Sequence, residues 1–174
     1  MRVMAFDIAT TTGVAFGIVG GTPRCTTIDF GKAQDHNLRF AKAIKTARFL
    51  IWKYKPDLIA YEAPIGGSNT SHVLVGLAAC IGGQIQLSGK PAHKVHVASI
   101  RKHFLGKHVT TAHFPNMKHA HAKTEIKKMV VRRCHQIGWK VRCDDEADAA
   151  ALWDYACATF CKGQSRPVGG LFDE

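Results

Sequence analysis

Long hydrophobic runs are missing from this 174-residue chain. No segment reaches the roughly 18 uncharged apolar residues that a membrane-spanning helix needs, so we expect no membrane partner. The first residues, Met1 and Arg2, lead directly into an apolar segment. They do not show the charged, apolar and small-residue order of a secretory signal peptide. We therefore expect an intracellular, cytoplasmic protein.

CxxC pairs are also missing, although the chain contains six cysteines. Such pairs are a common signature of zinc sites. Their absence argues against a zinc site built from Cys134, His135, Cys143, Cys157 and Cys161. Several of the cysteines lie among apolar residues at helical spacing. Free, buried thiols in a reducing compartment are the interpretation that fits best.

Acidic residues are nearly absent from the middle of the chain. Between Ala63 and Cys143 there are thirteen Lys and Arg residues and one acid, Glu125, in a chain of formal net charge +11. Eight of the ten histidines fall between His93 and His135. A sector of one charge sign is typical of a surface that binds a nucleic-acid backbone. The alternative is a solvated surface that keeps the protein soluble.

The apolar content of 46% is sufficient for one domain, residues 1–162, which we expect to be followed by a flexible tail, residues 163–174. Apolar runs and turn residues predict strands first, then alternating helices and strands. The expected strands cover 2–8, 12–21, 22–33, 58–64 and 92–98, and the expected helices cover 37–54, 71–87, 99–106, 122–137 and 145–161. This order predicts an α/β fold with a mixed sheet flanked by helices.

The histidine-rich segment between residues 106 and 122 has no clear periodicity, so we expect a long mobile loop there. The histidines in or near this segment are candidates for a phosphate contact or a proton donor. They are His103, His108, His113, His119 and His121. The simpler interpretation is a set of exposed polar residues.

Carboxylates stand at the ends of two apolar segments. Asp7 lies in the stretch AFDIATTTGVAFG, whose TTTG we expect to form a turn, and Glu62 lies in LIAYEAP. Asp145 and Asp148 are three residues apart, which places them on one face of the last predicted helix. Buried carboxylates need a cation or hydrogen-bond partners. Oxygen ligands suit Mg²⁺ or Mn²⁺, and a pair of such ions can promote phosphodiester hydrolysis.

Simpler roles exist for some of these acids. Asp144 and Glu146 point away from the face of Asp145 and are expected to act as charges at the start of the helix. Asp7 by itself could bond the backbone of a turn, and Glu62 could pair with a basic neighbour. These simpler roles explain the acids one at a time but not their occurrence together.

Three motifs together resemble those of a known family. FDIATTTGVAFG, LIAYEAP and DDEADAAALWDYA are similar, in order and spacing, to the motifs of RuvC-like Holliday junction endonucleases, across residues 2–161. The resemblance implies a ribonuclease H-like fold with a mixed five-stranded sheet, in which three antiparallel strands precede two parallel ones. It implies a catalytic metal site at Asp7, Glu62, Asp145 and Asp148, with Mg²⁺, or Mn²⁺ as a substitute, and two ions per site. It also implies a homodimer that nicks four-way DNA junctions symmetrically and uses no nucleotide cofactor.

The same resemblance implies contacts with DNA. Arg101 and Lys123 match positions where the family places basic residues near DNA. Further basic candidates in this sector are Lys102, Lys107 and Lys118. Where the family commonly has an aromatic or other large residue after the glutamate, this chain offers only Ile65. The long segment 106–122 replaces a compact glycine loop of the family, so strict four-way specificity and a broader branched-DNA specificity both stay open.

Two other functions are alternatives. An actin-like or sugar-kinase ATPase also begins with Asp followed by Thr and Gly, but it needs a second, similar subdomain. This chain lacks both the length and a second motif of that kind. The other alternative is a non-catalytic DNA-binding protein with the same fold. In such a protein, burying these carboxylates would cost free energy and serve no function.

Overall fold

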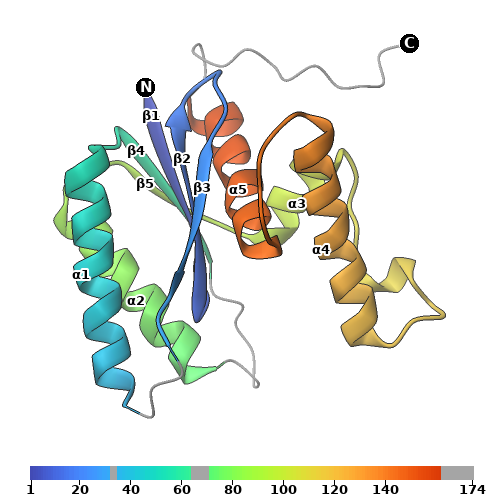
Figure 1. Cartoon of the computed structure of the whole chain (residues 1–174), viewed down its shortest axis with the longest axis horizontal. Helices are drawn as coiled ribbons and strands as arrows, with labels where there is room; N and C mark the ends of the chain where they lie inside the picture. Colours follow the sequence, from blue (N-terminus) through green and yellow to red (C-terminus); the bar gives the residue numbers. More distant parts are fainter. Residues whose placement is uncertain (32–34, 64–70, 162–174) are drawn as a thin grey trace.

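The computed structural model describes residues 1–31, 35–63 and 71–161. These residues form a five-stranded sheet with helices on both faces (Figure 1). The elements are β1 (Arg2–Asp7), β2 (Thr11–Ile18), β3 (Arg24–Asp29), α1 (His36–Tyr54), β4 (Leu58–Glu62), α2 (His72–Leu87), β5 (Ala92–Val95), α3 (Val97–Leu105), η1 (Thr111–His113), α4 (His119–Gln136) and α5 (Asp144–Phe160). Ile65 and the predicted tail, residues 163–174, lie outside the described residues.

The strands lie in the order β3-β2-β1-β4-β5. β1, β2 and β3 pair antiparallel, while β4 is parallel to β1 and β5 is parallel to β4. Short turns can join antiparallel neighbours, whereas a parallel neighbour needs a crossover. Here α1 and α2 supply the two crossovers. The predicted mixed sheet is confirmed.

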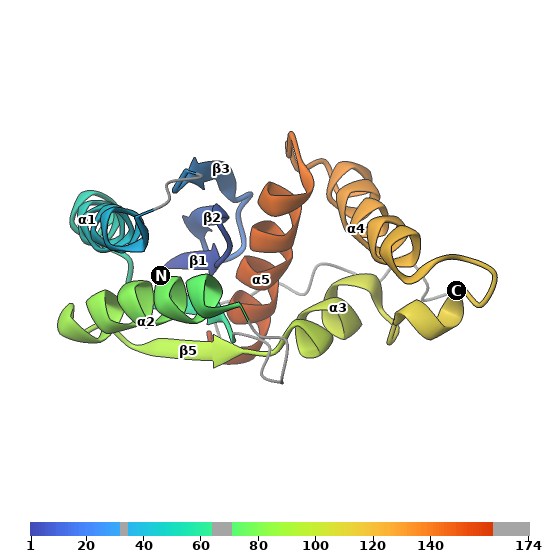
Figure 2. The ribbon, with the colours of Figure 1, turned by 90° about the horizontal axis from the view of Figure 1, so that it is seen from below.

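Alternate residues of the central strand face opposite helical layers. On β1, Val3 and Ala5 pack in the core cluster that contains α5, whereas Met4 and Phe6 pack in the cluster that contains α1 and α2. Figure 2 shows the two layers, with α1 and α2 on one side and α5, α3 and α4 on the other. Because side chains alternate along a strand, Asp7 continues the row that faces α5.

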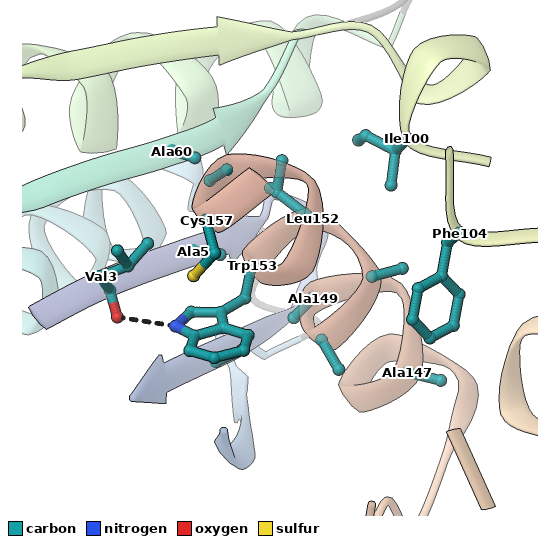
Figure 3. Packing of buried hydrophobic residues seen from close by; sticks show 14 of the residues in the cluster. Val3, Ala5, Ala60, Ile100, Phe104, Ala147, Ala149, Leu152, Trp153 and Cys157 are labelled. Atoms are coloured by element: carbon teal, nitrogen blue, oxygen red, sulfur yellow. Dashed lines mark hydrogen bonds between the residues drawn. The ribbon is translucent and has the colours of Figure 1, made fainter. Parts of the chain in front are cut away.

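Helix α5 packs closely on the sheet because small side chains line the contact. Ala149 of the helix and Ala5 and Ala60 of the strands are fully buried (Figure 3). Trp153 is 2% exposed, and its indole nitrogen donates a hydrogen bond to the carbonyl oxygen of Val3 at 3.1 Å. Truncating a core tryptophan to alanine costs about 3–5 kcal/mol. Trp153 and the alanines therefore determine where α5 lies on the sheet.

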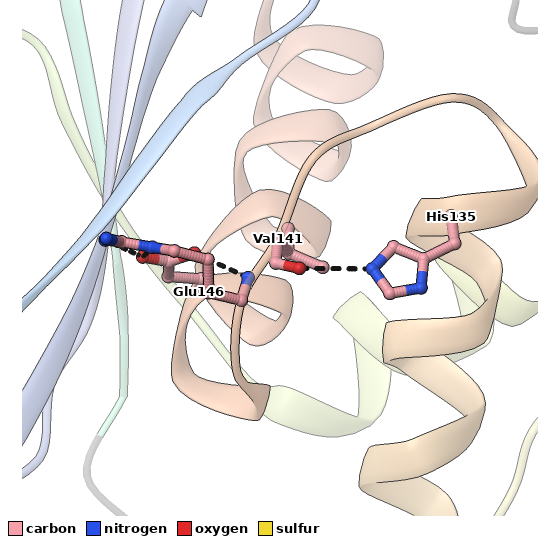
Figure 4. Close-up of polar contacts among 4 residues, drawn as sticks. His135, Val141 and Glu146 are labelled. Atoms are coloured by element: carbon pink, nitrogen blue, oxygen red, sulfur yellow. Dashed lines mark hydrogen bonds and ion pairs between the residues drawn. The ribbon is translucent and has the colours of Figure 1, made fainter.

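Hydrogen bonds hold the connection between α4 and α5 (Figure 4). Nε2 of His135 lies 3.1 Å from the carbonyl oxygen of Val141. The backbone N–H of Arg142 donates to Glu146 at 2.8 Å, and its guanidinium Nε donates to the same carboxylate at 3.0 Å. Glu146 lies in the first turn of α5, as predicted, but it is 1% exposed. Its partner Arg142 explains how a carboxylate can be buried there.

The predicted loop between residues 106 and 122 contains more regular structure than the sequence indicates. η1 forms within it, and α4 begins at His119 rather than near residue 122. The backbone N–H of Thr110 donates to Nδ1 of His113 at 3.2 Å, so a histidine side chain closes the turn. Ala122 is the first buried residue of α4. Hydrophobic periodicity therefore detects the helix only after its first three residues.

The cysteines agree with the predicted free thiols. All six are free, and Cys134, Cys157 and Cys161 are buried in the core beside α5. Burial raises the pKa of Cys134 to about 12. Among the described residues, no helix combines the length and the apolar character that crossing a membrane requires.

Candidate metal centre and active site

Asp7 and Glu62 lie side by side at one edge of the sheet. The parallel register of β1 and β4 pairs Phe6 with Tyr61, so the next residues, Asp7 and Glu62, stand level. Both continue the rows of side chains that face α5. The two side chains are close enough for each to shift the pKa of the other. Burial, followed by the charge of Glu62, raises the pKa of Asp7 well above its ordinary value, and burial raises the pKa of Glu62.

A glycine allows α5 to approach this pair. Gly13 pairs with Asp7 across the β1–β2 ladder. A Cβ atom at Gly13 would overlap the carbonyl oxygen of Asp145 and lie 2.7 Å from its carbonyl carbon and 3.1 Å from Cβ of Ala149. Only glycine therefore admits the first turn of α5 at this distance. The close approach brings Asp145 near Asp7, whose pKa is raised by the charge of Asp145.

The same residues argue against a phosphate-binding loop. Thr11, Thr12 and Gly13 belong to β2, so the prediction that TTTG forms a turn is wrong. The hydroxyl of Thr12 donates to the carbonyl oxygen of Ala9 at 2.7 Å, which closes the preceding turn. The first turn of α5 fills the space beside Gly13. A phosphate-binding loop needs accessible backbone N–H groups at this position. The segment that resembled the phosphate loop of an ATPase therefore cannot bind phosphate in this arrangement.

Asp148 lies one turn along α5 from Asp145. Burial, followed by the charge of Asp7, raises the pKa of Asp148 to about 7, although Arg101 and Lys127 oppose this rise. The charge of Asp148 in turn raises the pKa of Glu62. Asp7 is thus within electrostatic reach of each of the other three predicted acids.

This set of acids fits a hard divalent cation. All four acids have a raised pKa. Burial is the largest cause in each case, and it outweighs the opposing effect of the positive charge of Lys127. Oxygen-only donors in such a place suit Mg²⁺ or Mn²⁺. In the described part of the chain, one group of three donors lies within 4.8 Å of one another, and it consists of Cys143, Asp144 and Asp145. This group shares only Asp145 with the four predicted acids.

Two basic side chains border the acids. Nζ of Lys127, on α4, donates to Oδ2 of Asp144 at 2.7 Å and lies 4.0 Å from Oδ1 of Asp145. The positive charge of Arg101, on α3, opposes the rise in the pKa of Glu62 and of Asp148. Nε of Arg101 is buried and has no hydrogen-bond partner among the described residues. Arg101 is a predicted site residue, whereas sequence reasoning missed Lys127.

A weak signal for Lys127 does exist in the sequence. It follows the predicted Lys123 by four residues, so the two lie one turn apart on the same side of a helix. Lys128 stands directly beside it and carries the same charge. The sequence alone cannot tell which of these lysines faces the acids, because that depends on how α4 is rotated against α5.

The other predicted DNA contacts are exposed side chains around α3 and α4. Lys102 is in the last turn of α3, Lys107 follows that helix, Lys118 is the N-cap of α4, and Lys123 lies in its first turns. These helices lie on the α5 side of the sheet (Figure 2). The basic side chains thus belong to the layer that also carries the acids of α5.

Two of the candidate histidines make structural contacts. Nε2 of His103 lies 2.9 Å from Oδ2 of Asp154, and its ring meets Tyr155 edge-on. This contact joins α3 to α5, and His113 closes the turn at Thr110. For both histidines the geometry favours a structural role over a proton donor.

Asp148 predicts how the stability of the metal-free protein depends on pH. Its pKa is about 7 in the folded chain, against an ordinary value of 3.8. The folded state therefore binds this proton more tightly than the unfolded state, and its stability falls as the pH rises from about 4 to about 7. With a chelator present, we expect the Tm to be lower above about pH 7 than between about pH 4 and about pH 7. Asp148→Asn should reduce this difference in Tm. Thermal unfolding followed by circular dichroism tests this, and a difference that the substitution leaves unchanged would contradict it.

Solved structures of RuvC share this fold. A Thermus thermophilus RuvC structure matches with a TM-score of 0.70 at 16% identity, over 97% of this chain and 100% of that chain. T. thermophilus RuvC in complex with Holliday junction substrate matches with a TM-score of 0.69 at 14% identity, over 97% and 100% of the two chains. The yeast mitochondrial Holliday junction resolvase matches with a TM-score of 0.56 at 11% identity, over 90% of this chain and 80% of that one.

The sequence itself matches no family model and no curated protein. The likeness therefore rests on the backbone, and it extends over nearly the whole chain. Together with the strand order and the placement of α5, it shows that this chain has the ribonuclease H-like fold in the form found in RuvC.

Proposed function

We propose that this protein is a metal-dependent endonuclease that resolves Holliday junctions or related branched DNA. The observation that carries the proposal is the meeting of Asp7 and Glu62, level on two parallel strands, with Asp145 and Asp148 on the helix that packs against them. Burial is the largest cause of their raised pKa values, and a bound cation would favour the ionised carboxylates there. The fold supports the proposal, because one neighbour of the same fold is RuvC in complex with Holliday junction substrate.

In this proposal the four acids hold two Mg²⁺ ions, and Mn²⁺ can replace them. When bound, such ions lower the pKa of water and stabilise charge on phosphate oxygens. In the reaction, a water oxygen bonds to phosphorus, one bridging P–O bond breaks, and the departing oxygen takes up a proton. The carboxylates fix the geometry of the site from a strand pair and a packed helix, which are rigid elements.

Arg101 is the basic residue best placed to meet the scissile phosphate. Its charge reaches Glu62 and Asp148, and its buried Nε has no partner among the described residues. A phosphate group would accept hydrogen bonds from the accessible part of the guanidinium and neutralise its charge. Lys102, Lys107, Lys118 and Lys123 are exposed and would contact phosphates further along the DNA arms.

Arg101→Ala and Lys123→Ala should each weaken DNA binding and flatten its salt dependence. Each lost phosphate contact reduces the slope of log K against log salt by about 0.9. Lys45→Ala is the control, because Lys45 is a basic residue as exposed as Lys123 but lies on α1, across the sheet (Figure 2). Binding isotherms at several salt concentrations measure the slopes. Slopes equal to that of the control would count against phosphate contacts by Arg101 and Lys123.

We further propose that the enzyme acts as a homodimer that nicks two strands symmetrically. A four-way junction has approximate two-fold symmetry, which a two-fold protein dimer can match with two equivalent sites. Analytical ultracentrifugation of the full chain tests the dimer. Mapping the cleaved strands of one junction tests the symmetry.

The test of the proposed function is a cleavage assay with Mg²⁺ and with Mn²⁺. Four-way, three-way, flap and linear duplex substrates are compared at equal concentration. Cleavage of branched substrates in preference to linear duplex supports the proposal, and preference for the four-way junction supports the narrower activity. Binding of ATP at micromolar concentration without any DNA cleavage would favour the ATPase, and junction binding without cleavage would favour a non-catalytic DNA-binding protein.

A further inference from the structure

A lysine ammonium already lies among the acids at the start of α5. Nζ of Lys127 is 2.7 Å from Oδ2 of Asp144 and 4.0 Å from Oδ1 of Asp145. Lys127 thus gives its hydrogen bond to Asp144, and its contact with Asp145 is longer. The backbone carbonyl oxygen of Asp145 lies against Gly13, the β2 residue that pairs with Asp7.

Asp144 also belongs to the one group of donors that is already spaced like a metal site in the described residues. Donor atoms of Cys143, Asp144 and Asp145 all lie within 4.8 Å of one another. A thiol with two carboxylates suits a borderline metal such as Zn²⁺ better than Mg²⁺. An ammonium group and a metal ion repel each other strongly at such distances. The presence of Lys127 therefore decides whether Asp144 can act as a ligand.

We propose that Lys127 is a positioning residue that keeps Asp144 out of the metal ligand set and holds the first turn of α5 so that Asp145 stays beside Asp7. This inference rests on the proposed function, because it takes Asp145 and Asp7 to be ligands of the catalytic ions. The contact joins α4 to α5, so rotation of either helix would break it. Lys127 thereby distinguishes Asp144 from its neighbour Asp145.

Metal titration of the full chain without DNA tests the ligand selection. Lys127→Gln should bind one more Zn²⁺ than the wild-type chain, and the double variant Lys127→Gln/Asp144→Asn should return to the wild-type number. Lys128→Gln is the matched control, because the Lys128 side chain is 60% exposed and bonds Glu125 instead. Isothermal titration calorimetry counts the ions. Equal numbers in Lys127→Gln and Lys128→Gln would overturn the proposal.

Asp144→Asn in the wild-type background gives a second measurement that does not depend on the folding of Lys127→Gln. Since Asp144 is not a ligand in this proposal, the substitution should leave the number of bound Mn²⁺ ions unchanged. The loss of one ion would overturn the proposal.

Cleavage reports on the positioning role. Loss of a residue that orients a metal ligand commonly costs 10–100-fold in activity, so Lys127→Gln should cleave at least about tenfold more slowly with Mg²⁺. Lys127→Arg should restore most of the rate, because it keeps the charge and a hydrogen-bond donor. A wild-type chain that cleaves no branched DNA refutes the proposed function, while the ion counts above still test Lys127. Normal cleavage by Lys127→Gln refutes the positioning role alone.

Discussion

Asp7→Asn should abolish junction cleavage and leave junction binding intact. The substitution keeps the shape of the side chain but removes the charge of a proposed metal ligand that lies near the other three acids. Loss of a partner that merely orients a metal ligand costs about 10–100-fold, so loss of the ligand itself should cost more. DNA binding should be equal or tighter, because one negative charge near the phosphate is gone. Single-turnover cleavage and equilibrium binding on the same four-way junction measure the two effects.

The same variant should be more stable than the wild type when metal is absent. The pKa of Asp7 is raised by burial and by Glu62, so its ionised form opposes folding at neutral pH, and asparagine removes that opposition. Bound Mn²⁺ at a hundred times its Kd adds about 2.7 kcal/mol to the wild type, and the variant should gain less. Asp154→Asn is the control, since Asp154 is an acid of α5 that pairs with His103 outside the cluster. Full cleavage by Asp7→Asn would refute the assignment of the site.

Gly13→Ala should lower both stability and cleavage. The added Cβ would overlap the carbonyl oxygen of Asp145, which is backbone and cannot swing aside. Overpacking of this kind costs about 1–3 kcal/mol, and a chain of this length loses about 2–4 °C of Tm per kcal/mol. The helix must also move away from the sheet, and a displacement of about 1 Å can cost a hundredfold in rate. Thermal unfolding and the cleavage rate measure the two losses.

Gly83→Ala is the matched control for this prediction. Gly83 lies in α2, and a Cβ atom there would meet nothing within 4 Å. Alanine is favoured over glycine inside a helix by about 0.5–1 kcal/mol, so this variant should be slightly more stable and should cleave normally. If Gly13→Ala kept the wild-type rate, the close approach of α5 would not be what positions Asp145.

The acids of the candidate site could be predicted from the sequence because they follow local patterns. Asp7 and Glu62 stand where apolar strands end, and the alternation along each strand determines that they face the same layer as their buried neighbours. Asp145 and Asp148 share a helix face through their spacing alone. The order of hairpins and crossovers similarly predicts the sheet, because turn length limits which strands can pair antiparallel.

Other features depend on contacts between distant segments and have no local signal. Lys123, Lys127 and Lys128 look alike in the sequence, and only the rotation of α4 against α5 places Lys127 beside Asp144. Gly13 stands where the expected TTTG turn and the expected strand 12–21 overlap, and nothing local shows that it lies in β2 under the first turn of α5, more than a hundred residues away. The turn at Thr111–His113 depends on the contact between Thr110 and the side chain of His113, which periodicity does not detect.

By itself, the sequence determined that this protein has a mixed sheet, a basic middle and carboxylates at two strand ends and on one helix face. These are consequences of side-chain alternation, helical spacing and composition, which act between near neighbours in the chain. The tertiary structure decided which carboxylates lie close together, which acid pairs with Lys127 and how closely α5 approaches β2. Those outcomes depend on the packing of Trp153 and the alanines against the sheet. This packing determines the distances in space between residues that are far apart in the sequence.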